Sequence, residues 1–300
     1  MNLIIVGSIA IDDVQTPSGR NEDSFGGSAV YASVAASKFT ECGIVGVVGD
    51  DYPDTVCCQL KEQGIDIRGI EKVAGKTFRW KGVYNDLNKA ETLDTQLNVF
   101  AEFSPKLPNE YLNPKVLFLG NIHPQLQLDV IEKSGKPKVI ALDTMNFWIS
   151  STPELLKQVM QKIDILFINE DEIKQFTGKH NIYDAGDEIL KLGVKYVIIK
   201  RGEYGAVAYS KSLLFFMPTY PVRNVYDPTG AGDSFAGGFL GYISNENELS
   251  DSLIKKAMFF GTTTASINIE SFSFDRLLKA KNEEISQRVE RLKEVMCFEV

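Results

Sequence analysis

The residues best suited to chemistry lie in one short stretch, residues 227–239, which reads Asp-Pro-Thr-Gly-Ala-Gly-Asp-Ser-Phe-Ala-Gly-Gly-Phe. In it the small residues Gly230, Ala231 and Gly232 precede Asp233, and apolar residues at helical spacing follow. A glycine-rich turn that leads into a helix directs several backbone N–H groups to one point, where the helix dipole adds partial positive charge. An aspartate in the first helical turn can take the proton of a substrate hydroxyl. The stretch therefore predicts phosphoryl transfer to an alcohol.

Short apolar runs recur along the chain and alternate with helix-like segments. The runs occupy residues 3–6, 44–48, 116–119, 139–142, 163–168 and 196–200. Because most of them are continuously apolar, we expect strands that are covered on both faces. Helix-like segments lie between them, at residues 28–38, 153–160 and 183–192. This alternation predicts an α/β fold with a doubly wound, mostly parallel central sheet and helices on both faces.

Two segments interrupt the alternation and are typical of a small β-flap. Residues 77–84 have the composition of a strand, and residues 96–103 alternate apolar and polar side chains. A period of two indicates a sheet with one exposed face, and the polar residues 85–92 are interpreted as the connection. We expect a single domain over residues 1–300, with a lid formed by about residues 11–23 and 74–104 that covers the substrate. Two ordinary edge strands are the alternative.

The stretch of residues 227–239 resembles the C-terminal signature of the ribokinase-like carbohydrate kinases, the PfkB family. The resemblance implies that Asp233 is the catalytic base, which takes the proton of the acceptor hydroxyl as the γ-phosphoryl group leaves ATP. It also implies that the amides of Gly230, Ala231 and Gly232 form the anion hole for the transferring group. A tight glycine turn that enters a buried helix is the purely structural alternative.

Two further segments resemble family elements that bind the nucleotide and its metal. Asn169 and Glu172 match the N-x-x-E element, which helps hold magnesium, and their oxygen atoms are ligands of the kind that Mg²⁺ prefers. An acidic first turn of a helix is the alternative. Lys200, Gly202 and Gly205 match the K-x-G-x-x-G-A element beside ATP, although any β-hairpin would use such glycines.

The N-terminal part resembles the acceptor side of the family's site. Asp12 follows the first strand, where related sugar kinases use an acid to bind substrate hydroxyls, and a carboxylate accepts two hydroxyl hydrogens. Gly26 and Gly27 match the first signature, whose glycine pair lets the backbone reach the sugar. Many relatives carry asparagine four residues after the second glycine, where this chain has Tyr31. An aromatic ring there predicts stacking on a substrate ring or a narrower pocket, which disfavours ribose and fructose.

Two segments depart from the family pattern. Residues 143–148 partly match a D-x-N-x-R element but lack its arginine, which removes one expected contact to substrate or phosphate. Asn268 stands where relatives line the adenine and monovalent-cation sites, although the glycine-rich pattern that follows in relatives is absent. We therefore expect ATP and Mg²⁺ as ligands, with Asn268 on the ATP side and a monovalent cation as a further candidate.

These segments together predict an ATP-dependent kinase that phosphorylates a hydroxyl of a sugar or polyol. A nucleoside kinase of the same fold and a non-catalytic ribokinase-like binding protein are the alternatives. The intact Gly-Ala-Gly-Asp sequence argues against the non-catalytic alternative. The first strand is not followed by G-x-G-x-x-G, which disfavours a dinucleotide-binding oxidoreductase.

Charge and hydropathy narrow the range of partners. The net charge of −8 argues against nucleic acid and anionic membranes. The chain begins without a basic leader segment and has no apolar run of membrane-spanning length. We expect a cytoplasmic protein whose partner is a small molecule. A homodimer through the lid, paired along residues 96–103, is a further expectation.

Overall fold

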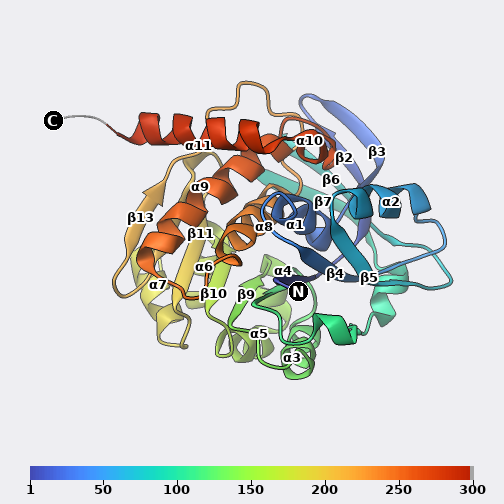
Figure 1. Ribbon diagram of the computed structural model, residues 1–300, viewed down its shortest axis with the longest axis horizontal. Helices are drawn as coiled ribbons and strands as arrows, with labels where there is room; N and C mark the ends of the chain where they lie inside the picture. Colours follow the sequence, from blue (N-terminus) through green and yellow to red (C-terminus); the bar gives the residue numbers. More distant parts are fainter. Residues whose placement is uncertain (298–300) are drawn as a thin grey trace.

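The computed structural model describes residues 1–297 and arranges them as two sheets with helices around the larger one (Figure 1). In this part of the chain the large sheet has nine strands in the order β13-β12-β11-β10-β9-β8-β1-β4-β5. The strands are β1 (Leu3–Val6), β4 (Cys42–Val48), β5 (Ile65–Lys72), β8 (Val116–Leu119), β9 (Val139–Asp143), β10 (Ile165–Asn169), β11 (Tyr196–Lys200), β12 (Ala206–Tyr209) and β13 (Leu214–Met217).

Most neighbours in the large sheet are parallel. β1 pairs in parallel with both β4 and β8, and the parallel pairing continues through β9 and β10 to β11. Only β12 and β13 run antiparallel at the margin. The doubly wound, mostly parallel sheet predicted from the sequence is therefore confirmed. Its parallel strands bring their carboxyl ends to one edge, where open α/β sheets place their ligands.

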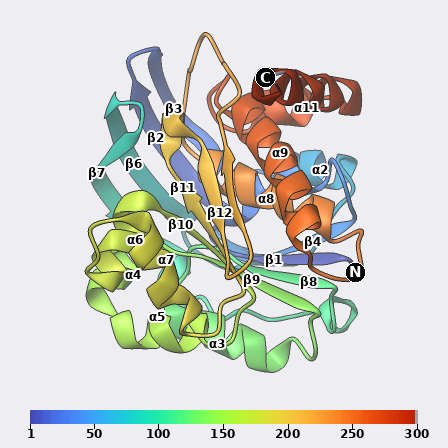
Figure 2. The ribbon, with the colours of Figure 1, turned by 90° about the vertical axis from the view of Figure 1, so that its left-hand side faces the viewer.

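Helices cover both faces of the large sheet (Figure 2). One buried cluster joins the sheet to α1, α8 and α9, and the other joins it to α3, α5, α6 and α7. The helices are α1 (Ser28–Ala36), α2 (Asp54–Glu62), α3 (Pro124–Lys133), α4 (Asn146–Ser151), α5 (Pro153–Met160), α6 (Glu170–Thr177), α7 (Ile182–Leu190), α8 (Ala231–Ile243), α9 (Asp251–Asn268), α10 (Asp275–Lys279) and α11 (Asn282–Met296). Short 3₁₀ turns are η1 (Asn98–Glu102), η2 (Asn109–Tyr111) and η3 (Gly202–Tyr204).

Within residues 1–297, none of these helices combines the length and the apolar character that a bilayer crossing would require.

The small sheet lies to one side of the large sheet and has the strand order β3-β2-β6-β7 (Figure 2). Its strands are β2 (Ala10–Thr16), β3 (Gly19–Gly26), β6 (Phe78–Asp86) and β7 (Lys89–Gln96). The central pair β2–β6 is parallel and the outer pairs are antiparallel. These strands overlap the ranges expected for a lid, and their closure over a substrate stays a prediction.

The second strand of the predicted flap was placed wrongly in the sequence. The sequence pattern favours a connection at residues 85–92, but residues 85–86 end β6 and residues 89–92 begin β7, and residues 96–103 mostly form η1. β7 is exposed at every residue, so it carries no apolar pattern that could reveal it. The apolar residues after it serve packing instead, since the ring of Phe100 lies 5.2 Å from that of Phe78. Most of residues 96–103 therefore form no strand through which the expected dimer could pair.

Candidate active site

The signature stretch forms a left-handed turn at the start of α8. Gly230 has φ 74° and ψ 3° and precedes the first helical residue, and Asp233 lies half-buried in the first turn. The N–H of Ala231 donates to the carbonyl of Pro228 over 3.1 Å. Within residues 1–297, the backbone amides of Gly232 and Asp233 have no acceptor. The N–H of Gly230 has no acceptor in these residues either, so two of the three amides expected from the sequence, those of Gly230 and Gly232, are free, and that of Ala231 is not.

Side chains beneath the turn fix its shape. Asp227 accepts a hydrogen bond from the N–H of Thr229 over 2.8 Å, and the Asn268 amide donates to the Thr229 carbonyl over 2.9 Å. A Cβ atom on Gly230 would lie 2.3–2.4 Å from three ring atoms of Tyr31, so only glycine fits above this ring. Asn268 is fully buried. It supports the turn from below, which argues against the direct ATP contact expected from the sequence.

An ion pair stands beside the turn, at the carboxyl ends of β9 and β11. The Nζ atom of Lys200 lies 2.9 and 2.6 Å from the two carboxylate oxygens of Asp143. A Cβ atom on Gly232 would lie 3.2 Å from the same Nζ atom. The ammonium group of Lys200 thus adds a positive charge next to the free amides of α8. This residue was expected to contact ATP, and its charge lies where phosphate oxygens could bind.

The charges around the signature turn favour Asp233 as a proton acceptor beside Lys200, which stays protonated. Burial raises the pKa of Asp233, and the charge of Asp143 raises it further, while Lys200 opposes both. Burial by itself lowers the pKa of Lys200, but Asp143 and Glu172 outweigh it and leave that pKa raised. Lys200 therefore stays protonated at neutral pH. A carboxylate with a raised pKa is a stronger base, which suits Asp233 to proton transfer near neutrality.

Asn169 and Glu172 form the start of α6 behind this ion pair. The Asn169 side chain accepts from the Glu172 N–H over 2.8 Å, and Glu172 Oε2 accepts from the Asn169 N–H over 2.8 Å. This is a capping box, so the acidic helix turn that was the alternative interpretation is present. Burial raises the pKa of Glu172 to about 7, against the opposing charge of Lys200.

The loop after β11 contains the two glycines expected beside ATP. Gly205 has φ 87°, and a Cβ atom there would lie 2.0 Å from the carbonyl oxygen of Met217, so glycine allows this close backbone approach. Gly202 lies against Asn88 from the β6–β7 turn of the small sheet. The Asn88 side chain accepts from the Glu203 N–H over 2.9 Å. The tip of the small sheet therefore contacts the predicted nucleotide loop.

Asp12 on β2 lies at the junction of the two sheets. It is 4% exposed, and its carboxylate accepts no hydrogen bond from any group in residues 1–297. Burial raises its pKa, and the charges of Asp227 and Asp233 add to this effect. A Cβ atom on Gly26 would lie 2.5 Å from Asp12 Oδ2, so this glycine leaves the carboxylate its space. Asp12 is thus close to the candidate base and free to bind hydroxyl groups.

Gly27 and Tyr31 have structural roles next to Asp12. Gly27 has φ 97° at the start of α1, and a Cβ atom there would lie 2.5 Å from the Ser8 carbonyl oxygen. The Tyr31 ring is 1% exposed and packs beneath Gly230. The stacking on a substrate ring expected from the sequence is therefore wrong, because no ring face is accessible. The Tyr31 hydroxyl has no partner among the described residues and lies on the Gly26 side.

Tyr84 of β6 belongs to this site and was missed in the sequence. Its hydroxyl accepts a hydrogen bond from Thr229 Oγ1 over 3.3 Å, which links the small sheet to the signature turn. Burial raises its pKa, and the charges of Asp227 and Asp12 contribute to the shift. A period-two pattern through residues 78–84 places Tyr84 on the same face as Trp80, and this was the available signal.

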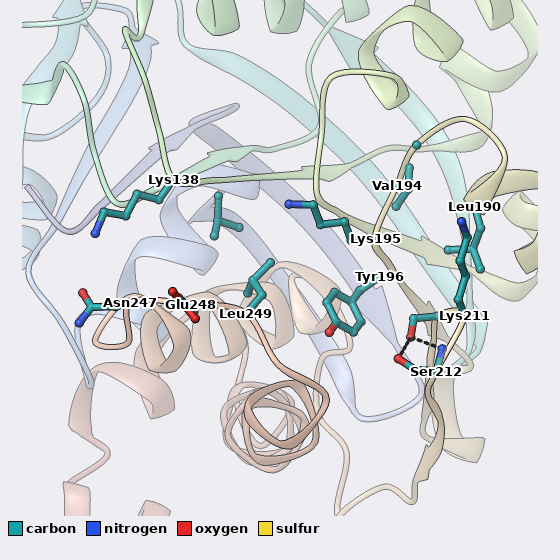
Figure 3. A pocket seen from close by; sticks show the side chains of 13 residues that line it. Lys138, Leu190, Val194, Lys195, Tyr196, Lys211, Ser212, Asn247, Glu248 and Leu249 are labelled. Carbon is teal, nitrogen blue, oxygen red and sulfur yellow. Dashed lines mark hydrogen bonds between the residues drawn. The ribbon is translucent and has the colours of Figure 1, made fainter.

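A separate cavity of about 620 Å³ opens at the opposite edge of the large sheet (Figure 3). Val139 and Tyr196, the first residues of β9 and β11, line it together with Lys138, Lys195, Lys211 and Leu249. Asp143 and Lys200 end the same two strands. The cavity is therefore one strand length away from the ion pair. It holds none of the groups that the signature brings together, and we place the candidate active site at the carboxyl edge.

Comparison with known proteins finds a family model and named relatives that resemble this chain. The family model described as "pfkB family carbohydrate kinase" matches residues 2–280. The cytidine kinase of Thermococcus kodakarensis is 31% identical over 258 residues, which cover 84% of this chain and 91% of that protein.

Two solved structures share the fold. The nucleoside kinase of Burkholderia thailandensis, solved with ADP-inosine, aligns with a TM-score of 0.81 at 18% identity, covering 97% of this chain and 95% of that chain. The ribokinase of Thermotoga maritima aligns with a TM-score of 0.75 at 24% identity, covering 96% and 99%. At these identities the two structures establish the ribokinase-like fold alone.

Proposed function

The chain belongs to the pfkB family of carbohydrate kinases, and on that premise we propose that it transfers the γ-phosphoryl group of ATP to a hydroxyl of a nucleoside. Kinases of this family act on hydroxyl groups of sugars or nucleosides. The observation that carries the reaction is Asp233 in the first turn of α8, beside free amides and the Lys200 ammonium group. The choice of a nucleoside is supported by the identity with a cytidine kinase over most of both chains.

In the proposed reaction Asp233 takes the proton of the acceptor hydroxyl. The hydroxyl oxygen forms a bond to the γ-phosphorus as the bond to the bridging oxygen breaks, and ADP leaves with that electron pair. The N–H groups of Gly232 and Asp233 and the ammonium of Lys200 stabilise the charge on the transferring group. Asp12 holds hydroxyl groups of the acceptor and so orients the attacking oxygen.

Mg²⁺ accompanies ATP in kinases of this family, where the ion neutralises charge on the phosphates. We assign Asn169 and Glu172 to hold it through water, because the capping box occupies Asn169 Oδ1 and Glu172 Oε2 and leaves Glu172 Oε1 to accept from a metal-bound water. No group of three or more His, Cys, Asp or Glu residues suited to a metal occurs in residues 1–297. So sparse a donor set fits Mg²⁺, which keeps several waters and binds substrate phosphates.

A monovalent cation beneath the signature turn is part of the proposal. Asp227 Oδ2 and Asn268 Oδ1 are buried oxygens without a hydrogen-bond partner in the described residues. Buried oxygens without donors are costly unless a cation or water satisfies them. These two residues already hold Thr229 of the turn. A cation bound there would therefore stiffen the turn that carries the free amides.

A free sugar or polyol is the second candidate acceptor. The Asp12 carboxylate favours it, because an unpaired acid binds any pair of neighbouring hydroxyl groups and needs no base attached to them. The reaction steps would be the same. Only the groups that contact the rest of the acceptor would differ.

A coupled assay of ADP release over nucleosides, ribose, deoxyribose and inositols tests the proposal. We expect at least one nucleoside to be phosphorylated, and Asp233→Asn to lower kcat by about 10²–10⁴-fold while KM changes little. Turnover of sugars without any nucleoside would favour the second candidate. No turnover with any acceptor would favour a non-catalytic binding protein. Asp233→Asn activity within about threefold of the original would rule out the base.

A further inference from the structure

One face of β6 is turned toward the candidate active site. Successive residues of a strand point to opposite faces, so Trp80, Gly82 and Tyr84 share one face. Tyr84 contacts Thr229 of the signature turn, which fixes the direction of that face. Trp80 stands in register with Asp12 on the parallel neighbour β2. The backbone of Trp80 is therefore beside that of the acid expected to hold the acceptor hydroxyls.

The indole lies flat across the small sheet. A Cβ atom on Gly82 would lie 2.1, 2.3 and 2.9 Å from Cη2, Cζ2 and Cζ3 of Trp80, so the ring covers this glycine. The indole N–H donates to Thr92 Oγ1 over 3.1 Å, and Thr92 of β7 is the strand partner of Gly82. The ring is thus held at its edge and on one face. Its opposite face is turned away from Gly82, and the residue is only half-buried.

From this arrangement we infer that Trp80 binds the planar base of the acceptor by stacking and sets the preference of the site for nucleosides. The inference rests on the proposed kinase function. The hydroxyl-bearing ring would lie at Asp12, between Trp80 and Asp233, and the base would lie on the outer face of the indole. A flat ring fixed in advance loses little freedom on binding, which favours stacking. A free sugar would use Asp12 alone.

Tyr31 and Trp80 differ in the way that this role requires. Both are aromatic residues near Asp12, but the Tyr31 ring is buried beneath the signature turn. The Trp80 ring instead packs on the backbone of Gly82, which has no side chain to displace it, and the residue is only half-buried. The sequence Trp80-Lys-Gly82 on β6 therefore builds a stacking surface that a larger residue at position 82 would destroy.

Kinetics of Trp80 variants test the inference against a merely structural role. We expect Trp80→Leu to raise KM for the nucleoside about tenfold or more, with kcat changed less than about threefold. Trp80→Phe keeps a ring and should stay within about threefold of the original KM. Gly82→Ala displaces the indole without removing it and should reproduce the Trp80→Leu effect. KM for an acceptor without a base, such as ribose, should not change in any of these variants.

Fluorescence tests the same contact without altering Trp80. The chain has two tryptophans, so Trp148→Phe leaves Trp80 as the sole emitter. Saturable quenching by the nucleoside, with none by ribose, is the expected result. This measurement also decides the question if Trp80→Leu fails to fold.

The possible failures are distinguishable. Nucleoside turnover with equal KM changes for nucleoside and ribose, or without quenching, overturns the stacking and leaves the proposed kinase intact. Saturable quenching by nucleosides that are never phosphorylated supports the stacking and overturns the proposed reaction. Sugar turnover with neither nucleoside turnover nor quenching overturns both.

Discussion

The two sheets meet at one group of carboxylates but are built in opposite ways. β1, β4 and β8 of the large sheet are buried at every residue, whereas β7 of the small sheet is exposed at every residue. A strand buried on both faces can offer chemistry only at its end, as Asp143 and Lys200 do. A strand with one free face can present a row of side chains, as β6 does with Trp80 and Tyr84. In our proposal the large sheet therefore performs the transfer, and the small sheet selects the acceptor.

The strongest test of this division is Lys200→Met, at the end of β11. Loss of the ammonium removes a positive charge beside the free amide of Gly232, so we expect kcat to fall about 10²–10³-fold. KM for the acceptor should stay within about threefold, because the hydrogen bonds of Lys200 in the described residues go to Asp143 of the large sheet and none goes to the small sheet. Steady-state kinetics with varied acceptor and ATP measures both values.

Lys195→Met is the matched control for this substitution. Lys195 precedes the same strand at its amino end, where it pairs with Asp164 over 2.8 Å. It should leave kcat within about twofold of the original. If Lys200→Met raised acceptor KM and spared kcat, the assignment of the transfer to the large sheet would be wrong.

The pH dependence should separate catalysis from stability at the large sheet. Asp233 acts as a base only when ionised, so kcat should fall by about tenfold per pH unit below its raised pKa. The free energy of unfolding should instead fall as the pH rises, because the pKa of Glu172 is about 7 in the folded protein and lower in the unfolded chain. Its stabilising contribution is complete below about pH 4.5 and is lost as the pH rises through about 7.

Thermal unfolding of the ligand-free protein and of Glu172→Gln across pH 4.5–8 measures this contribution by difference. The Tm of the original protein, relative to Glu172→Gln, should decline as the pH rises, while kcat increases. The difference cancels the other titrating groups. A Tm difference that grew with pH would show that Glu172 is charged and satisfied in the folded state.

The same contrast between the sheets explains what the sequence could predict. Apolar runs such as residues 116–119 report burial directly, and the glycine turn before Asp233 is a local pattern, so the large sheet and the signature were found. β7 has the sequence Lys-Ala-Glu-Thr-Leu-Asp-Thr-Gln and is held by pairing alone, so no pattern revealed it. Contacts between residues far apart in the sequence leave no local pattern either. Tyr84 and Thr229 are 145 residues apart, and burial of the Tyr31 ring depends on a turn nearly 200 residues later.

Tyr84→Phe should give the smallest effect, because it removes one hydrogen bond between the sheets and leaves the ring in place. The bond from Thr229 Oγ1 is worth about 0.5–1.5 kcal/mol, equivalent to about 2–10-fold. We expect this change mainly in KM for the acceptor, since the bond holds β6 and its Trp80 over the site. Thr229→Val removes the same bond from the other side. The double variant should therefore be no worse than the more affected single variant.

Tyr209→Phe is the control for loss of a tyrosine hydroxyl, because Tyr209 donates to Asp187 over 2.7 Å on β12, away from the small sheet. It should leave acceptor KM unchanged. Additive effects of Tyr84→Phe and Thr229→Val would mean that the two hydroxyls act independently. In that case the small sheet would be held over the site by other contacts, such as that of Asn88 with Glu203, and Tyr84 would only fill space.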